Sequence, residues 1–153
     1  MMDTMEKTKI TPEEYKRLKA EVIDKIVVAR VGLLLRHPFF GNMATRLQIK
    51  ECDEWCPTAA TDGRNLFYNV DFFSKLSNKE IEFVIAHEIL HCVFDHMTRR
   101  EDRDPQLHNI ACDYIVNNTL CRDNIGEKPK DIQIFQDWKY DGWTSEAVYD
   151  DIY

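Results

Sequence analysis

Residues 86–91 read Ala86-His87-Glu88-Ile89-Leu90-His91. The pattern H-E-x-x-H on a helix is typical of zinc peptidases. Residues four apart on an α-helix lie about 40° apart around its axis, so His87 and His91 can reach one metal ion from one face. Glu88 lies at the edge of that face, where its carboxylate can take a proton from a zinc-bound water without being a ligand.

Apolar side chains surround this motif almost all round the helix, which predicts that the helix is buried. They are Ile81, Phe83, Val84, Ile85, Ala86, Ile89, Leu90, Val93 and Phe94. Buried polar groups are costly unless they are paired, so the two histidines and the glutamate need partners. One interpretation is a Zn²⁺ site. The alternative is that the histidines are core residues satisfied by hydrogen bonds.

The composition indicates one globular domain over residues 1–153. The net charge is −7 and there is no long Lys/Arg cluster, which argues against a nucleic-acid partner. No apolar run approaches the ~20 residues of a membrane span. The first ten residues carry Asp3 and Glu6 and no apolar signal core. We expect a cytoplasmic protein whose five cysteines are thiols, since Cys52 and Cys56 lack the C-x-x-C spacing.

The N-terminal half predicts a long helix followed by a small sheet. Thr11 and Pro12 begin the helix, which should end near Arg36 because His37 precedes a proline. Residues 1–9 should be frayed, and residues 39–42 should form a turn. Residues 47–49 predict a strand, and Asp62-Gly63 between residues 58–61 and 66–69 predicts a hairpin. The expected sheet is mainly antiparallel, with three or four strands, in an α+β fold.

The second half predicts helices. Ser77 and Glu80 form a capping box that begins the motif helix, and Asp104-Pro105 begins the next helix. That helix has a polar stripe, Asn109, Asp113 and Asn117, which either faces solvent or is buried against the histidines. The scarcity of charge between residues 107 and 120 favours burial. His108 should lie at the surface, residues 122–142 should be irregular, and residues 144–153 should form a short helix.

Two residues compete for the third metal ligand. His96 is nine positions from His87, which on an unbroken helix places it on the opposite face, and no glycine breaks the helix before it. Asp113 comes from the next helix, and Asn109 and Asn117 on either side of it could orient it. The helix geometry favours Asp113. In the alternative, His96 binds the metal and Asp113 holds His87 or His91 by a hydrogen bond.

Motifs along nearly the whole chain resemble one family. They are Pro38-Phe39-Phe40-Gly41, Thr58 to Arg64, Tyr68-Asn69, Ala86 to His91, His96, Arg99, Asn109 to Tyr114 and Ser145 to Tyr149. The chain is similar to the putative metallopeptidase domain, which is found N-terminal to a von Willebrand factor A-like domain in bacterial and phage proteins. The resemblance implies a zincin-like fold whose edge strand, here in the hairpin of residues 58–69, borders the cleft. It also implies a partner domain or protein of von Willebrand factor A type. Asp95 stands where the family often has glycine.

These observations lead us to expect a zinc-dependent peptidase in which Glu88 is the general base and the peptide substrate adds as a strand to the sheet edge. Tyr114 and Arg99 are candidate oxyanion donors. Two alternatives remain open at this point. One is a metal-binding regulatory or pseudo-peptidase domain that acts through a protein partner. The other is a zinc hydrolase acting on RNA, which the acidic charge disfavours.

Overall fold

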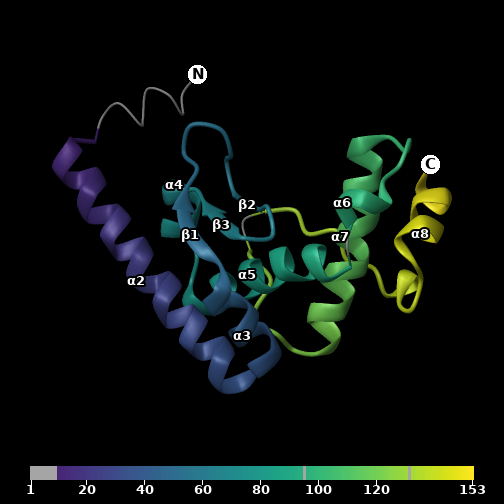
Figure 1. The fold of residues 1–153 in the computed structure, drawn as a ribbon, viewed down its shortest axis with the longest axis horizontal. Helices are drawn as coiled ribbons and strands as arrows, with labels where there is room; N and C mark the ends of the chain where they lie inside the picture. The colour runs from purple at the N-terminus through teal and green to yellow at the C-terminus, as the bar shows by residue number, and fades with distance from the viewer. Residues whose placement is uncertain (1–9, 95, 131) are drawn as a thin grey trace.

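The computed structural model describes residues 10–94, 96–130 and 132–153, so the expectation for residues 1–9 lies outside the described residues. The chain forms an α+β fold, as predicted. Figure 1 shows helix α2 (Pro12–Arg36) and the sheet on one side of the molecule, and α7 (Pro105–Arg122) with α8 (Ser145–Ile152) on the other. Helix α5 (Asn78–Val93), which carries the H-E-x-x-H motif, lies between the two sides and joins them.

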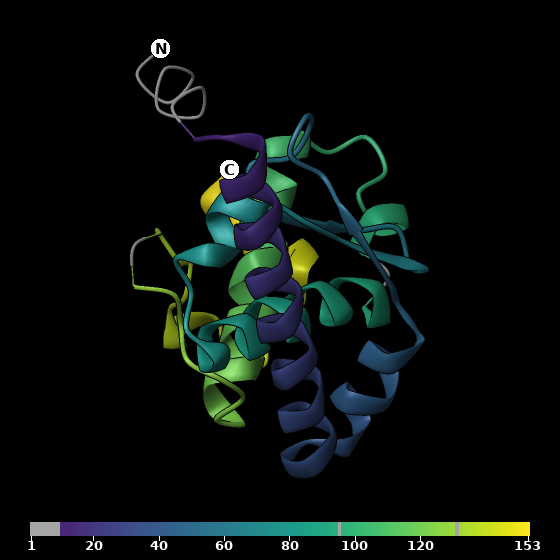
Figure 2. The ribbon, with the colours of Figure 1, turned by 90° about the vertical axis from the view of Figure 1, so that its left-hand side faces the viewer.

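Helix α2 begins and ends where the sequence predicts. Thr11 is its N-cap, and the Thr11 side-chain oxygen accepts a hydrogen bond from the Glu14 amide at 3.1 Å. The helix ends at Arg36 because the residue before a proline disfavours the helical conformation. One face is buried and contributes Val22, Ile26, Ala29 and Leu33 to the core. Figure 2 shows α2 crossing the full height of the molecule on the side that faces the viewer.

The predicted turn at residues 39–42 is wrong, because these residues belong to helix α3 (Pro38–Arg46). Pro38 occupies the first turn of this helix, where its missing N–H costs nothing. Gly41 allows close packing instead of a turn, since a Cβ atom there would lie 2.2 Å from the Leu34 Cα atom. A glycine that permits contact between two helices has the same sequence signature as a turn glycine.

The sheet is mixed, which corrects the prediction of a mainly antiparallel sheet. Its order is β1 (Gln48–Glu51), β3 (Asn65–Tyr68), β2 (Ala59–Thr61). Strand β3 pairs with β1 in parallel and with β2 antiparallel, so the predicted hairpin is confirmed. Its turn is held by the Asp62 Oδ1 atom, which accepts hydrogen bonds from the amides of Arg64 and Asn65 at 2.9 and 2.8 Å. The hairpin places β3 in the centre and leaves β2 at an edge.

Helix α5 has the predicted capping box. The Ser77 hydroxyl oxygen accepts from the Glu80 amide at 3.2 Å, and the Glu80 Oε1 atom accepts from the Ser77 amide at 2.9 Å. Most side chains from Glu80 to Leu90 are buried, as the apolar pattern predicts. The helix packs against α2, α7 and β2, so the motif is fixed by the rest of the fold.

After α7 the chain returns across the molecule. The segment of residues 127–137, of which Asp131 is not described, runs from the start of α5 to the side of α7 without regular structure. The amide of Lys130 donates to Glu80 Oε2 at 2.9 Å, and the Asn118 side chain donates to the Asp137 carbonyl at 2.8 Å. A short 3-10 helix, η1 (Trp138–Tyr140), and α8 follow. The predicted cap of α7, Asp104, is confirmed, and the predicted final helix is confirmed as α8, with Thr144 as its N-cap.

Two of the general expectations can be compared with the structure. Within the part of the chain that the structure describes, no helix combines the length and the apolar character needed to cross a membrane. Each of the cysteines is free, as predicted: Cys52, Cys56, Cys92, Cys112 and Cys121.

Candidate metal centre

Three side chains from two helices converge on one point. His87 and His91 lie one turn apart on α5, and Asp113 reaches them from α7. The Nε2 atoms of the two histidines are 2.9 Å apart, and Asp113 Oδ1 lies 3.1 Å from His87 Nε2 and 3.0 Å from His91 Nε2. Among the described residues, these three form the group with the geometry to hold a metal ion.

The donor atoms fit a zinc ion. Ligand atoms that surround Zn²⁺ tetrahedrally at about 2.0–2.1 Å are about 3.3 Å from one another, close to the 2.9–3.1 Å separations here. Two imidazole nitrogens and one carboxylate oxygen are also the donors that zinc takes in open sites with three protein ligands. Burial alone would raise the pKa of Asp113, but hydrogen bonds with His87 and His91 lower it, so the carboxylate is charged.

Asn117, one turn after Asp113 on α7, fixes the orientation of His87. Its Nδ2 atom donates to the Phe135 carbonyl at 3.0 Å, which turns its Oδ1 atom toward His87 Nδ1, 2.8 Å away. A carbonyl oxygen can only accept, so His87 Nδ1 carries a proton, and Nε2 is the ring nitrogen that is turned to the centre and would bind an ion there. This is the usual role of a hydrogen-bond partner behind a metal-binding histidine.

His96 lies behind His91. Its Nδ1 atom is 3.0 Å from His91 Nδ1, the nitrogen on the side of the ring away from Asp113. His96 is only 3% exposed, and burial lowers its pKa to about 3, so the ring is neutral and can accept the His91 Nδ1 proton. The structure therefore brings His87, His91 and Asp113 together and leaves His96 outside this group.

His96 lies outside the group for a different reason from the one expected, which was an unbroken helix that carries it to the opposite face. Helix α5 is not continuous to His96: it ends at Val93, and His96 begins a separate short helix, α6 (His96–Arg99). The Arg99 Nη1 atom donates to the Phe94 carbonyl at 3.1 Å and so satisfies the end of α5, a capping role common for arginine. Asp95 lies outside the described residues.

Two expectations near the centre are wrong. His108 is buried, not at the surface, because it packs beneath α6 and its Nε2 atom donates to the His96 carbonyl at 2.7 Å. Asn109 is exposed, so it faces solvent and is not a buried partner that orients Asp113. Of the predicted stripe, Asn117 is therefore buried, Asp113 is partly buried at the centre, and Asn109 faces solvent.

Glu88 lies next to the three converging side chains without joining them. Its Oε2 atom is buried and has no hydrogen-bond partner among the described residues. Burial raises the pKa of the carboxyl, although the neighbouring His87 and His91 pull it the other way. A buried carboxylate oxygen without a partner is costly, which is expected of a group that meets water or substrate during a reaction.

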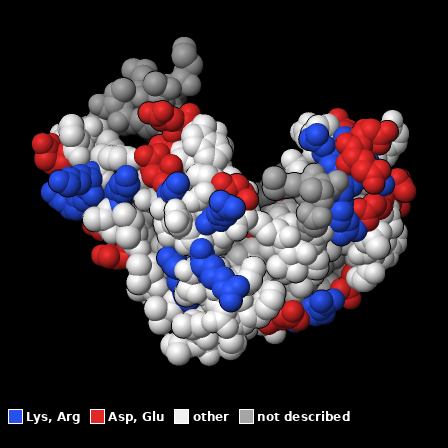
Figure 3. Space-filling model, in the orientation of Figure 1, with Lys and Arg blue, Asp and Glu red and all other residues white. Residues whose placement is uncertain are grey.

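A cavity of about 200 Å³ opens beside the centre. It is lined by Thr58 and Ala59 at β2, by Phe72, by Phe83, Val84, His87 and Glu88 on α5, by Asp113 and Asn117 on α7, and by Pro129, Ile132, Gln133, Ile134 and Phe135. Figure 3 shows a hollow between the sheet side and the α7–α8 side of the molecule, with a mostly uncharged floor and charged side chains on its rims.

The candidate oxyanion donors are engaged elsewhere. Arg99 is paired with Glu146, and Tyr114 packs against Phe135 and Tyr140. Neither is among the described residues that line the cavity. The residues of the cavity wall were not predicted from the sequence. Phe83 and Val84 could have been found, because they lie one turn before His87 and Glu88, whereas nothing local places residues 129–135 opposite them.

An α+β fold with an H-E-x-x-H helix, a carboxylate from the following helix and a free glutamate beside them defines a candidate metal-dependent hydrolase. Residues 23–153 match the model of the family described as "Putative metallopeptidase domain", and the chain belongs to that family. The membership confirms the resemblance found in the sequence and supports a metal-dependent peptidase. No curated protein and no solved structure matches the chain.

Proposed function

We propose that the protein is a zinc-dependent peptidase in which His87, His91 and Asp113 hold the ion and Glu88 is the general base. The observation that carries the proposal is the convergence of three donor atoms within 4.8 Å of one another, beside a glutamate whose Oε2 atom is buried and at the wall of a cavity. When bound, the ion would supply Lewis-acid chemistry, which polarises the scissile carbonyl and lowers the pKa of the attacking water.

The side chains around the centre have complementary tasks. Asp113 contributes the one negative charge of the ligand set. Asn117 keeps His87 Nε2 directed at the centre, and His96 does the same for His91 by accepting its Nδ1 proton. Glu88, with a raised pKa, takes a proton from the attacking water and passes it to the leaving amine.

The sheet edge offers a way to align a peptide. Strand β2 is paired on one side only, and Thr58 and Ala59 line the cavity. An extended substrate can add as a strand to this edge, with main-chain hydrogen bonds setting its register. Helix α5 packs against β2. This packing supports the zincin-like fold that we propose, in which the edge strand borders the cleft.

The test uses Glu88→Gln, with Glu21→Gln on the exposed side of α2 as a control for the same chemical change. We expect Glu88→Gln to keep about one zinc per chain and to lose peptidase activity by at least ~10² on a mixed peptide library. The control should match the parent in both measurements. Equal activity of Glu88→Gln and the parent would refute the mechanism. A parent that binds zinc and cleaves no peptide would favour a metal-binding regulatory domain.

A further inference from the structure

We propose that the cavity beside the metal centre is a preformed pocket for one large apolar side chain, so that the substrates are peptides with such a residue next to the scissile bond. This inference rests on the proposed peptidase function and adds the substrate class. Four observations carry it: the position of the cavity, the chemistry of its walls, its size, and the anchoring of the 127–137 segment.

The cavity lies directly beside the reacting groups. Phe83 and Val84 line it, and each is four residues before a member of the motif, His87 and Glu88 respectively. Four residues rise about 6 Å along an α-helix, which is the span of about two residues of an extended peptide at about 3.3 Å each. A peptide whose carbonyl lies at the centre therefore places a neighbouring side chain against this turn of α5.

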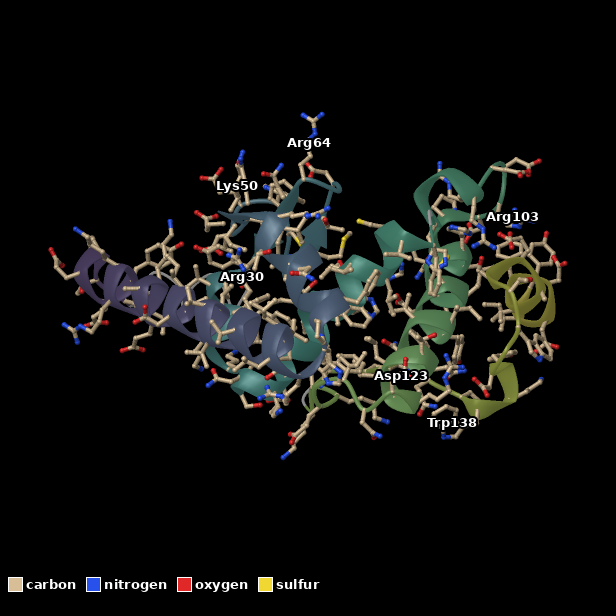
Figure 4. The ribbon with its side chains drawn as sticks, turned by 60° about the horizontal axis from the view of Figure 1, so that its bottom comes forward. Arg30, Lys50, Arg64, Arg103, Asp123 and Trp138 are labelled. Carbon is tan, nitrogen blue, oxygen red and sulfur yellow. The ribbon has the colours of Figure 1, made fainter. Side chains whose placement is uncertain are left out.

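The walls away from the centre are mainly apolar, with Thr58 and Gln133 as uncharged polar residues. Phe72, Phe83, Val84, Ile132 and Ile134 contribute the apolar surface, and the charged or titratable lining residues that the structure describes are His87, Glu88 and Asp113, all at the metal end. Figure 4 shows Arg64, at the tip of the nearby hairpin, pointing away from the molecule. A charged substrate side chain would lose its hydration in this pocket and gain no paired charge, which is costly.

The size of the cavity suits one side chain. Its volume of about 200 Å³ is below the ≈ 300–1,000 Å³ of pockets that enclose drug-sized ligands or cofactors. A leucine or phenylalanine side chain fits within such a space, whereas a glycine leaves it empty. The pocket therefore discriminates by buried apolar area, which is the main source of affinity for such groups.

The outer wall is fixed before substrate arrives. The described residues of this wall, 129, 130 and 132–135, are anchored by the hydrogen bond from the Lys130 amide to Glu80 and by that from Asn117 to the Phe135 carbonyl. Between these anchors Ile132 remains 38% exposed at the rim, where a bound side chain would cover it. A wall held at both ends needs little ordering when substrate binds, which favours affinity and selectivity.

The experiment measures binding without turnover. Short peptide hydroxamates, which bind zinc through the hydroxamate, would carry glycine, leucine, phenylalanine, aspartate or lysine at the position next to the hydroxamate. Their dissociation constants would be measured on the zinc-loaded protein. We expect the leucine and phenylalanine compounds to bind at least ~10-fold more tightly than the glycine compound. The aspartate and lysine compounds should bind no more tightly than glycine.

Ile132→Asp tests the wall, and Ile23→Asp is its control, because Ile23 on α2 has nearly the same exposure, 40% against 38%. Ile132→Asp should reduce the preference for leucine over glycine by at least ~5-fold and change the glycine affinity less than ~2-fold. Ile23→Asp should change neither quantity. Val84→Phe, which fills the pocket from α5, should weaken the leucine and phenylalanine compounds selectively.

The outcomes separate the two proposals. If zinc binds and all compounds bind equally, or the charged ones bind best, the pocket inference is overturned while the metal centre stands. The same holds if Ile132→Asp and Ile23→Asp behave alike. If the protein takes up no zinc, the proposed function fails and the inference fails with it.

Discussion

The assignment of Asp113 as the third ligand gives a quantitative prediction when it is compared with His96. Asp113→Ala removes one of three donor atoms that lie within about 3 Å of one another, together with the one negative charge of the set. His96→Ala removes only the acceptor of the His91 Nδ1 proton, a contact of 3.0 Å. Loss of such an outer partner typically costs 10–100-fold in metal affinity, so Asp113→Ala should cost more than ~100-fold.

The assay is competition for zinc with a chromophoric chelator, with both variants and the parent measured side by side. His96 is buried, so His96→Asn, which keeps an acceptor near the Nδ1 position, controls for the cavity that alanine leaves. Far-UV circular dichroism of the metal-free proteins checks that each variant is folded. If His96→Ala strips the metal while Asp113→Ala weakens binding only 10–100-fold, the two residues exchange roles and the reasoning is refuted.

Three further predictions concern the surroundings of the centre. Asn117→Ala should weaken zinc binding by ~10–100-fold without abolishing it, because His87 loses the partner that fixes its tautomer, and the same chelator competition measures it. Burial alone would raise the pKa of Glu80, but the hydrogen bonds that its carboxylate accepts from the Ser77 and Lys130 amides lower the pKa. The ionised carboxylate therefore stabilises the folded protein above the usual pKa of a glutamate, and this stabilisation is lost as the pH falls through the lowered pKa. Urea titrations of the metal-free protein should therefore show Glu80→Gln less stable than the parent by about 1–2 kcal/mol at pH 7, with the difference shrinking in acid; an unchanged difference would contradict the assignment. Thiol titration under denaturing, non-reducing conditions should find five thiols, whereas a Cys52–Cys56 disulfide would contradict the expected cytoplasmic location.

The starts of α2, α5 and α7 and the shared helix face of His87 and His91 could be predicted from the sequence, because each depends on residues close together in the chain. The side chains of Thr11, Ser77 and Asp104 cap these helices by accepting hydrogen bonds from the amides three residues on. The H-E-x-x-H spacing likewise becomes a single face as soon as α5 forms. These local rules do not need the tertiary structure.

Contacts between distant segments decided the rest. The parallel pairing of β1 with β3 depends on where the hairpin of β2 and β3 packs against β1. Gly41 allows a close contact between helices only because α2 lies against it. Histidine is a common metal ligand, but the end of α5 places His96 beside His91 Nδ1, the ring nitrogen that faces away from Asp113. The wall of residues 129–135 is set by hydrogen bonds to α5 and α7, each joining residues at least 18 positions apart. Capping and periodicity are short-range properties of a sequence, whereas the side chains that meet across the metal centre are chosen by the packing of whole helices.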